Sequence, residues 1–134
     1  MARLLDKEDF VGALAHAETA VRRAGRVAVV REALALVAYE SGDWATALRE
    51  FRTARRLSGS SHVLPYMVDC ERGLGRLDRA LELAASPEVA QLTREQRVEL
   101  AIVVSGVRLD LQQAAAAAAE LERVPELRKG IRAS

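Results

Sequence analysis

A short motif that recurs every 33 to 37 residues constrains the fold of this chain more than any other feature. It has a turn residue, a large apolar residue and, three positions further on, an alanine followed by leucine. The copies are Asp9-Phe10-x-x-Ala13-Leu14, Asp43-Trp44-x-x-Ala47-Leu48, Arg76-Leu77-x-x-Ala80-Leu81 and a degenerate Gln113-Ala114-x-x-Ala117-Ala118. A repeat of this length is one supersecondary unit that buries its apolar face against neighbouring copies. The chain is therefore expected to stack repeated units.

Between the motifs, the apolar residues follow the period of an α-helix. They recur at steps of three and four in Val27, Val30, Leu34, Val37 and Ala38. Gly42 then suits the left-handed residue that ends a helix, and Asp43 suits the N-cap of the next helix. Thr93 and Gln96 have the spacing of a capping box. We expect further helices over residues 44–57, 63–73, 77–85, 94–109 and 112–124.

The composition favours an all-helical chain. The 134 residues are 50% hydrophobic but only 4% aromatic, because the apolar fraction comes from alanine, leucine and valine. Such a mixture suits close-packed helices, whereas β-sandwiches and barrels use β-branched and aromatic residues. The length is typical of one domain, and the balance of 20 basic and 19 acidic residues argues against disorder. We predict a single all-α domain.

The second repeat shows a resemblance to a known family. Its leucine, small and aromatic positions are Leu34-Ala35, Ala47-x-x-x-Phe51 and Ala54. In these positions the chain resembles the tetratricopeptide repeat family, whose units are helical hairpins of about 34 residues. Arg31 and Ala38 stand where that family most often has tryptophan and tyrosine. Residues 60–72 also resemble uncharacterised tetratricopeptide-like proteins of actinobacteria, which implies a bacterial protein.

The resemblance implies a right-handed solenoid of antiparallel helical hairpins, with about seven helices. Its units would be a half repeat at residues 6–25 and hairpins at 27–59, 62–86 and 93–124, followed by a frayed tail at 125–134. The half repeat lacks a partner helix, which would leave uncovered the side with Phe10, Val11, Leu14 and Val21. We expect the ends to meet another copy, as in a homo-oligomer, or to belong to a longer array.

Members of this family bind ligands in a concave groove lined by the first helix of each hairpin, so the resemblance also implies a groove here. The residues expected to face it are Val29, Glu32, Leu36, Tyr39, Glu40, His62, Tyr66, Asp69, Arg72, Glu99, Ile102, Leu109 and Asp110. A mixed apolar and polar groove holds an extended peptide or a helix. The expected function is therefore a protein-binding scaffold, and the alternative is a solvated or internal face without a ligand.

Arginines crowd the expected outer helices. They follow at helical spacing in Arg49, Arg52, Arg55 and Arg56, and one repeat earlier in Arg22, Arg23 and Arg26. Such a ridge could track phosphates, which gives a nucleic-acid-associated regulator as the alternative function. However, only Phe51 interleaves with it for base stacking, and the net charge is +1. A solvated face paired with Glu18 and Glu50 is the favoured interpretation.

No group of residues in the sequence indicates catalysis, a metal site or a cofactor. His16 and His62 lie on different repeats without further ligands at metal spacing, and Cys70 is typical of a small core residue. Residues 58–62 lack the strand-to-helix elbow of a serine nucleophile, so we expect a loop there. Because no group of residues indicates catalysis, we expect a non-enzymatic protein. No apolar run approaches the roughly 20 residues of a membrane span, so we also expect the protein to be cytoplasmic.

Overall fold

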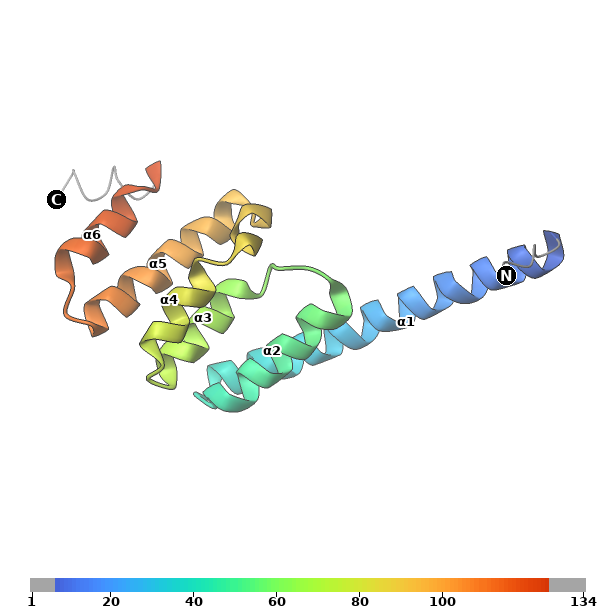
Figure 1. The fold of residues 1–134 in the computed structure, drawn as a ribbon. Coiled ribbons are helices and arrows are strands. Elements are labelled where there is room, and N and C mark those ends of the chain that lie inside the picture. Colours follow the sequence, from blue (N-terminus) through green and yellow to red (C-terminus); the bar gives the residue numbers. More distant parts are fainter. Residues whose placement is uncertain (1–6, 126–134) are drawn as a thin grey trace.

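In the computed structural model, which describes residues 7–125, the chain is all-helical (Figure 1). Its elements are α1 (Lys7–Glu40), α2 (Trp44–Ser58), α3 (Leu64–Gly73), α4 (Leu77–Ala84), the short 3-10 helix η1 (Pro87–Gln91), α5 (Arg94–Asp110) and α6 (Ala114–Glu122). No strand occurs within the described residues, so the predicted all-α class is confirmed. The start of the expected half repeat and nearly all of the expected tail lie outside them. None of the described helices is long and apolar enough to cross a membrane.

The helices pack in pairs that follow the order of the chain. Contacts join α1 to α2, α3 to α4 and α5 to α6, while α2–α3, α3–α5 and α4–α5 contacts connect the pairs. The first half of α1 extends away from the other helices (Figure 1). There Val11 is exposed, and the side chains of Phe10, Leu14 and Val21 lie outside the described part.

Turn and cap residues set the helix boundaries where the sequence predicts them. Gly42 is left-handed with a φ of 78°, and the Asp43 carboxylate accepts a hydrogen bond from the backbone N–H of Thr46 over 3.3 Å. At the start of α5, the Thr93 hydroxyl accepts from the N–H of Gln96, whose side chain accepts from the N–H of Thr93. These groups satisfy backbone donors that the first helical turn leaves unpaired.

One predicted boundary is wrong. The sequence predicts one helix over residues 6–25 and another from residue 27, but residues 7–40 form the single helix α1, and the described chain has six α-helices instead of about seven. Gly25 stands at the expected break without adopting a left-handed backbone. A glycine inside a helix costs only about 1 kcal/mol, and α1 contains no proline that would end it.

Two apolar cores share α3. The first lies between α1, α2 and α3 and contains Ala35, Ala38, Ala47, Leu48, Phe51, Val63, Met67 and Cys70. The second lies between α3, α4 and α5 and contains Leu64, Val68, Ala80, Leu92, Leu100, Val104 and Val107. Met67 and Val68 are consecutive and enter different cores, because successive helical residues point about 100° apart. Helix α3 therefore connects the N-terminal and C-terminal halves of the fold.

The apolar period over residues 27–38 is helical as expected, but most of these side chains are not buried. Ala38 is buried, whereas Val27, Val30, Leu34 and Val37 are exposed. Helix α2 packs on the neighbouring face of α1, which carries the buried residues Ala28, Ala35 and Ala38. Alanines let two helix backbones approach closely, so the larger side chains of α1 point elsewhere.

Candidate functional site

Side chains from three helices form a continuous line across α1, α3 and α5. Three polar links connect them: Glu32 with His62, Tyr39 with Asp69, and Arg72 with Asp110. We call this surface the groove face and define it by Glu32, Leu36, Tyr39, His62, Pro65, Tyr66, Asp69, Arg72, Glu99, Ile102, Val103 and Asp110. The first helix of each pair supplies all of these residues except His62.

Tyr39 links α1 to α3. It lies on the same side of α1 as Glu32 and Leu36, because the three residues are spaced by four and three positions. Its hydroxyl donates a hydrogen bond to Oδ2 of Asp69 over 2.5 Å, and its ring meets the Tyr66 ring edge-on at 5.2 Å. Burial, followed by the bond to Asp69, raises the pKa of Tyr39 well above its usual value. The hydroxyl therefore remains a donor at neutral pH.

Arg72 links α3 to α5. Its Nε donates to Oδ2 of Asp110 over 2.7 Å, and its Nη1 lies 3.7 Å from Oδ1 of Asp69. The hydrogen bond between Arg72 and Asp110 raises the pKa of the guanidinium and lowers the pKa of the carboxyl. Gly106 leaves room for this link, because a Cβ at that position would overlap the Arg72 guanidinium. The pair sets the distance between α3 and α5 at this end of the groove face.

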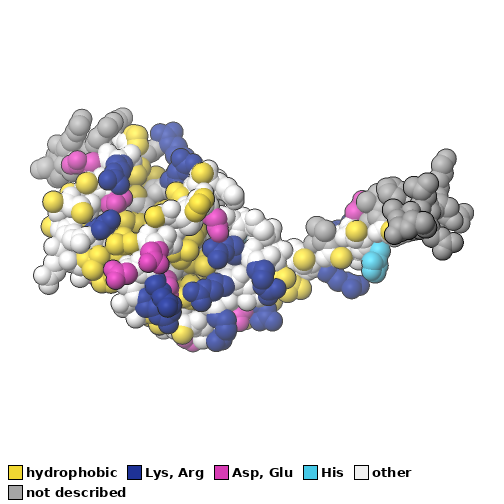
Figure 2. Space-filling model, in the orientation of Figure 1, with side chains coloured by type: hydrophobic (Ala, Val, Ile, Leu, Met, Phe, Trp, Pro, Cys, Tyr) yellow, Lys and Arg dark blue, Asp and Glu magenta, His cyan; other side chains and the backbone are white. Residues whose placement is uncertain are grey.

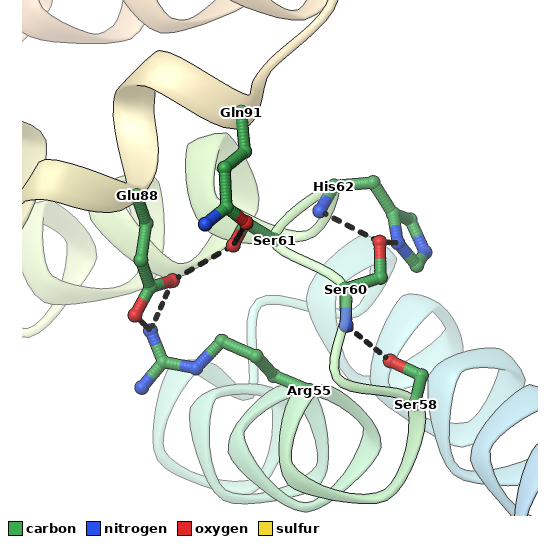
Figure 3. Close-up of polar contacts among 7 residues, drawn as sticks. All are labelled: Arg55, Ser58, Ser60, Ser61, His62, Glu88 and Gln91. Atoms are coloured by element: carbon green, nitrogen blue, oxygen red, sulfur yellow. Dashed lines mark hydrogen bonds and ion pairs between the residues drawn. The ribbon is translucent and has the colours of Figure 1, made fainter.

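His62 joins the groove face to the loop between α2 and α3. Its Nε2 lies 2.8 Å from both carboxylate oxygens of Glu32. Its Nδ1 lies 2.7 Å from the Ser60 hydroxyl, as Figure 3 shows. In the same loop, Ser61 donates to Glu88 of η1 over 3.1 Å. Residues 59–62 thus form an inter-helical loop, as the sequence predicts, whereas Ser58 is still the last residue of α2. Both ring nitrogens of His62 have structural partners.

A shallow apolar hollow lies near the middle of the groove face. It has a volume of about 200 Å³ and is lined by Tyr39, Pro65, Tyr66, Glu99, Ile102 and Val103. Ile102 is half exposed at its edge, and Glu99 is an exposed carboxylate on the same helix. A hollow of this size accepts one apolar side chain, with Glu99 placed to meet a neighbouring cation.

The groove face carries more acidic than basic groups. Its carboxylates belong to Glu32, Asp69, Glu99 and Asp110, while Arg72 is its one guanidinium. The two carboxylates beside Arg72 neutralise that guanidinium and leave an acidic surplus. The whole chain, by contrast, has a net charge of +1. Charge is therefore distributed unevenly between this face and the rest of the molecule.

The structure brings together most of the residues predicted to face a groove. Those in mutual contact or around the hollow are Glu32, Tyr39, His62, Tyr66, Asp69, Arg72, Glu99, Ile102 and Asp110. Leu36 packs partly against the first core, while Val29, Glu40 and Leu109 are exposed and do not line the hollow.

The groove residues expected from the sequence do not include Pro65, Val103 or Gly106. Val103 gives no distinctive signal among the apolar residues of α5. Gly106 does give one, because a glycine inside a helix indicates a close approach by another group, and here that group is the Arg72 guanidinium.

The predicted arginine ridge lies on a different surface. Basic side chains gather over α2 and the neighbouring part of α4 (Figure 2), and Arg49, Arg52 and Arg56 are exposed. Arg55 is paired with Glu88 at 3.2 Å. Glu50, expected to pair with this ridge, instead pairs with Arg31 of α1 at 3.2 Å.

Comparison of the chain with protein-family models, curated proteins and solved structures found no match.

Proposed function

We propose that this chain is a non-enzymatic protein-binding module, a right-handed tetratricopeptide-like solenoid of helical hairpins. Its groove face would bind a segment of another protein that carries basic residues around one apolar anchor. The observation that carries the proposal is the apolar hollow between Tyr66 and Ile102 within an acidic face built from three helices. Each hairpin adds its first helix to one continuous surface, which suits an extended or helical ligand.

The links across the groove face support a preformed site. Tyr39, Asp69, Arg72 and Asp110 fix one another through hydrogen bonds and ion pairs. A ligand would therefore meet side chains already in position, and little conformational freedom would be lost on binding. Glu99, by contrast, makes no ion pair within the described residues and is available to a cationic ligand.

The second candidate function is nucleic-acid binding by the arginine ridge, favoured by the exposed arginines of α2. Acidic residues lie among them: the hollow between α2 and α4 is lined by the exposed Glu82 and the buried Glu71 together with Arg52, Arg55 and Arg79. A phosphate backbone would approach these carboxylates as well as the arginines, and the carboxylates weaken the attraction between the ridge and a nucleic acid. The groove-face proposal is therefore preferred.

The first test uses two fluorescein-labelled peptides of equal length, one alternating lysine with leucine and the other glutamate with leucine. We expect fluorescence anisotropy to show binding of the lysine peptide and much weaker binding of the glutamate peptide. Glu99→Lys should weaken binding of the lysine peptide by about fivefold, or about 1 kcal/mol, the upper range for one exposed ion pair.

Glu82→Lys is the matched control, because it makes the same charge change at an exposed position on α4. Equal affinity for both peptides, or equal weakening by the two variants, would contradict the groove-face proposal. A labelled RNA oligonucleotide tests the second candidate. Binding that falls steeply with salt and is lost in Arg49/Arg52/Arg56→Glu would favour the arginine ridge instead.

A further inference from the structure

An exposed apolar row runs along α1 on a side that no described helix covers. It consists of Val27, Val30, Leu34 and Val37, whose exposed fractions are 45%, 57%, 49% and 69%. We call these four residues the α1 stripe. Their spacing of three, four and three places them on one helical face, next to the face that packs on α2. A shallow hollow lined by Arg26, Val27, Val30, Arg31 and Leu34 follows the first part of the stripe.

The spacing of the stripe is that of a helix–helix seam. In a pair of packed helices, the residues that insert their side chains between those of the other helix are spaced by alternating steps of three and four. Four large aliphatic side chains in a continuous exposed row are typical of an interaction surface. The expected occupant is therefore another helix.

The charges at the two ends of the stripe indicate which helix fits. Arg23 lies one turn before Val27, and Glu40 lies about one turn after Val37. Both side chains are exposed and make no ion pair within the described residues. Consider a helix in which a basic residue precedes an acidic residue in sequence. It would meet both charges if it ran antiparallel to α1.

Helix α1 itself has these properties, and we propose that a second copy of this chain docks on the stripe with the two α1 helices antiparallel. A two-fold axis near residue 32 would place Val27 opposite Val37 of the second copy, and Val30 opposite Leu34 of the second copy. Arg23 would then lie beside Glu40 of the second copy, twice in the dimer. A parallel arrangement would instead bring like charges together. The surface is self-complementary, as a two-fold interface requires.

This interface is separate from the groove face. The stripe has no residue in common with it, so a ligand and a second copy can bind at the same time. Because the seam contains only four residues from each chain, we expect a weak dimer that dissociates at micromolar concentrations, in the range of small protein interfaces.

The test is sedimentation velocity of the full chain over a concentration series, combined with charge exchange. We expect wild type to dimerise reversibly. Arg23→Glu alone and Glu40→Arg alone should each weaken the dimer, by about threefold to tenfold for two exposed pairs. The double variant Arg23→Glu/Glu40→Arg should restore it, because the opposite charges are then exchanged. All of these positions are exposed, so circular dichroism should show unchanged folding.

A disulfide experiment tests the direction of the helices. Chains carrying Val30→Cys are mixed with chains carrying Leu34→Cys and oxidised under mild conditions. We expect the mixed dimer to form in preference to either homodimer. Wild type that remains monomeric at all concentrations, or a double variant no better than the single variants, would overturn the proposal. Preferred disulfide pairing between two chains that both carry Val30→Cys would overturn the antiparallel arrangement.

Discussion

Cys70 combines complete burial with two acidic neighbours in sequence. Its side chain lies in the first core and has no exposed surface. Burial first, and then the charges of Asp69 and Glu71, raise the pKa of the thiol to about 12. The thiolate is the reactive form of cysteine, so this residue acts as a small apolar core side chain.

We predict that Cys70 resists alkylation at pH 8. Because its pKa is raised, the thiolate fraction becomes substantial only as the pH approaches 12, and at pH 8 it should be lower by about 1,000-fold than for an unperturbed thiol. Iodoacetamide labelling followed by mass spectrometry measures this directly. Labelling should be complete in denaturant, and rapid labelling of the folded chain would contradict the prediction.

The groove face shows which site residues a sequence can and cannot identify. Helical spacing places Glu32, Leu36 and Tyr39 on one side of a helix, and the family resemblance indicates which side faces a groove. The partners of these residues depend on how neighbouring helices are rotated and spaced, which no local pattern contains. The pairing of Arg72 with Asp110, 38 residues away, is therefore a result of the structure.

At the scale of the elements, the α1–α2 pair depends on a seam of small residues. Ala35 and Ala47 are completely buried there, and Ala38 is nearly so. With alanines on both sides, the space between the two helices leaves no room for a larger side chain.

We predict that Ala47→Leu lowers the free energy of unfolding by about 1–3 kcal/mol, the usual cost of overpacking a close seam. Ala45→Leu is the control, since Ala45 lies on the same helix but is exposed. Urea denaturation followed by circular dichroism measures both. Equal stability of the Ala47 variant and wild type would show that this seam tolerates a larger residue.

Helix boundaries could be predicted where a cap or turn residue marks them, and not elsewhere. Gly42, Asp43 and Thr93 identify the ends of helices because each satisfies a backbone requirement that is local. Gly25 is ambiguous, since a glycine can end a helix or lie within it. The sequence also could not show which apolar residues of α1 are buried. Apolar residues recur with the same helical period on the face that packs on α2 and on the exposed face.

At the scale of the whole molecule, the longest helix is only partly supported. Helix α1 has 34 residues and α2 has 15, which correspond to roughly 51 Å and 22 Å at 1.5 Å per residue. The first half of α1 therefore extends beyond its partner, as Figure 1 shows. Helical segments of that length are marginally stable without packing.

We predict that backbone amides in residues 12–23 exchange with solvent much faster than those in residues 28–40. Among the side chains that the structure describes in these two segments, buried ones occur only in the second, where Ala28, Ala35 and Ala38 are buried. Hydrogen exchange with mass spectrometry measures this, at a concentration low enough for the chain to be monomeric. Equal protection of the two segments would show that the first half of α1 is stabilised by contacts other than those with α2.

The position of Trp44 has a practical consequence for the whole molecule. Its indole packs so closely on Gly73 that a Cβ there would overlap the ring, and it borders a hollow of about 270 Å³ together with Asp69, Arg72 and Asp110. Since the chain contains no other tryptophan, its tryptophan fluorescence comes from this one position, between the first core and the ion pairs of Arg72. The protein thus carries an intrinsic optical reporter of the junction between α2, α3 and α5.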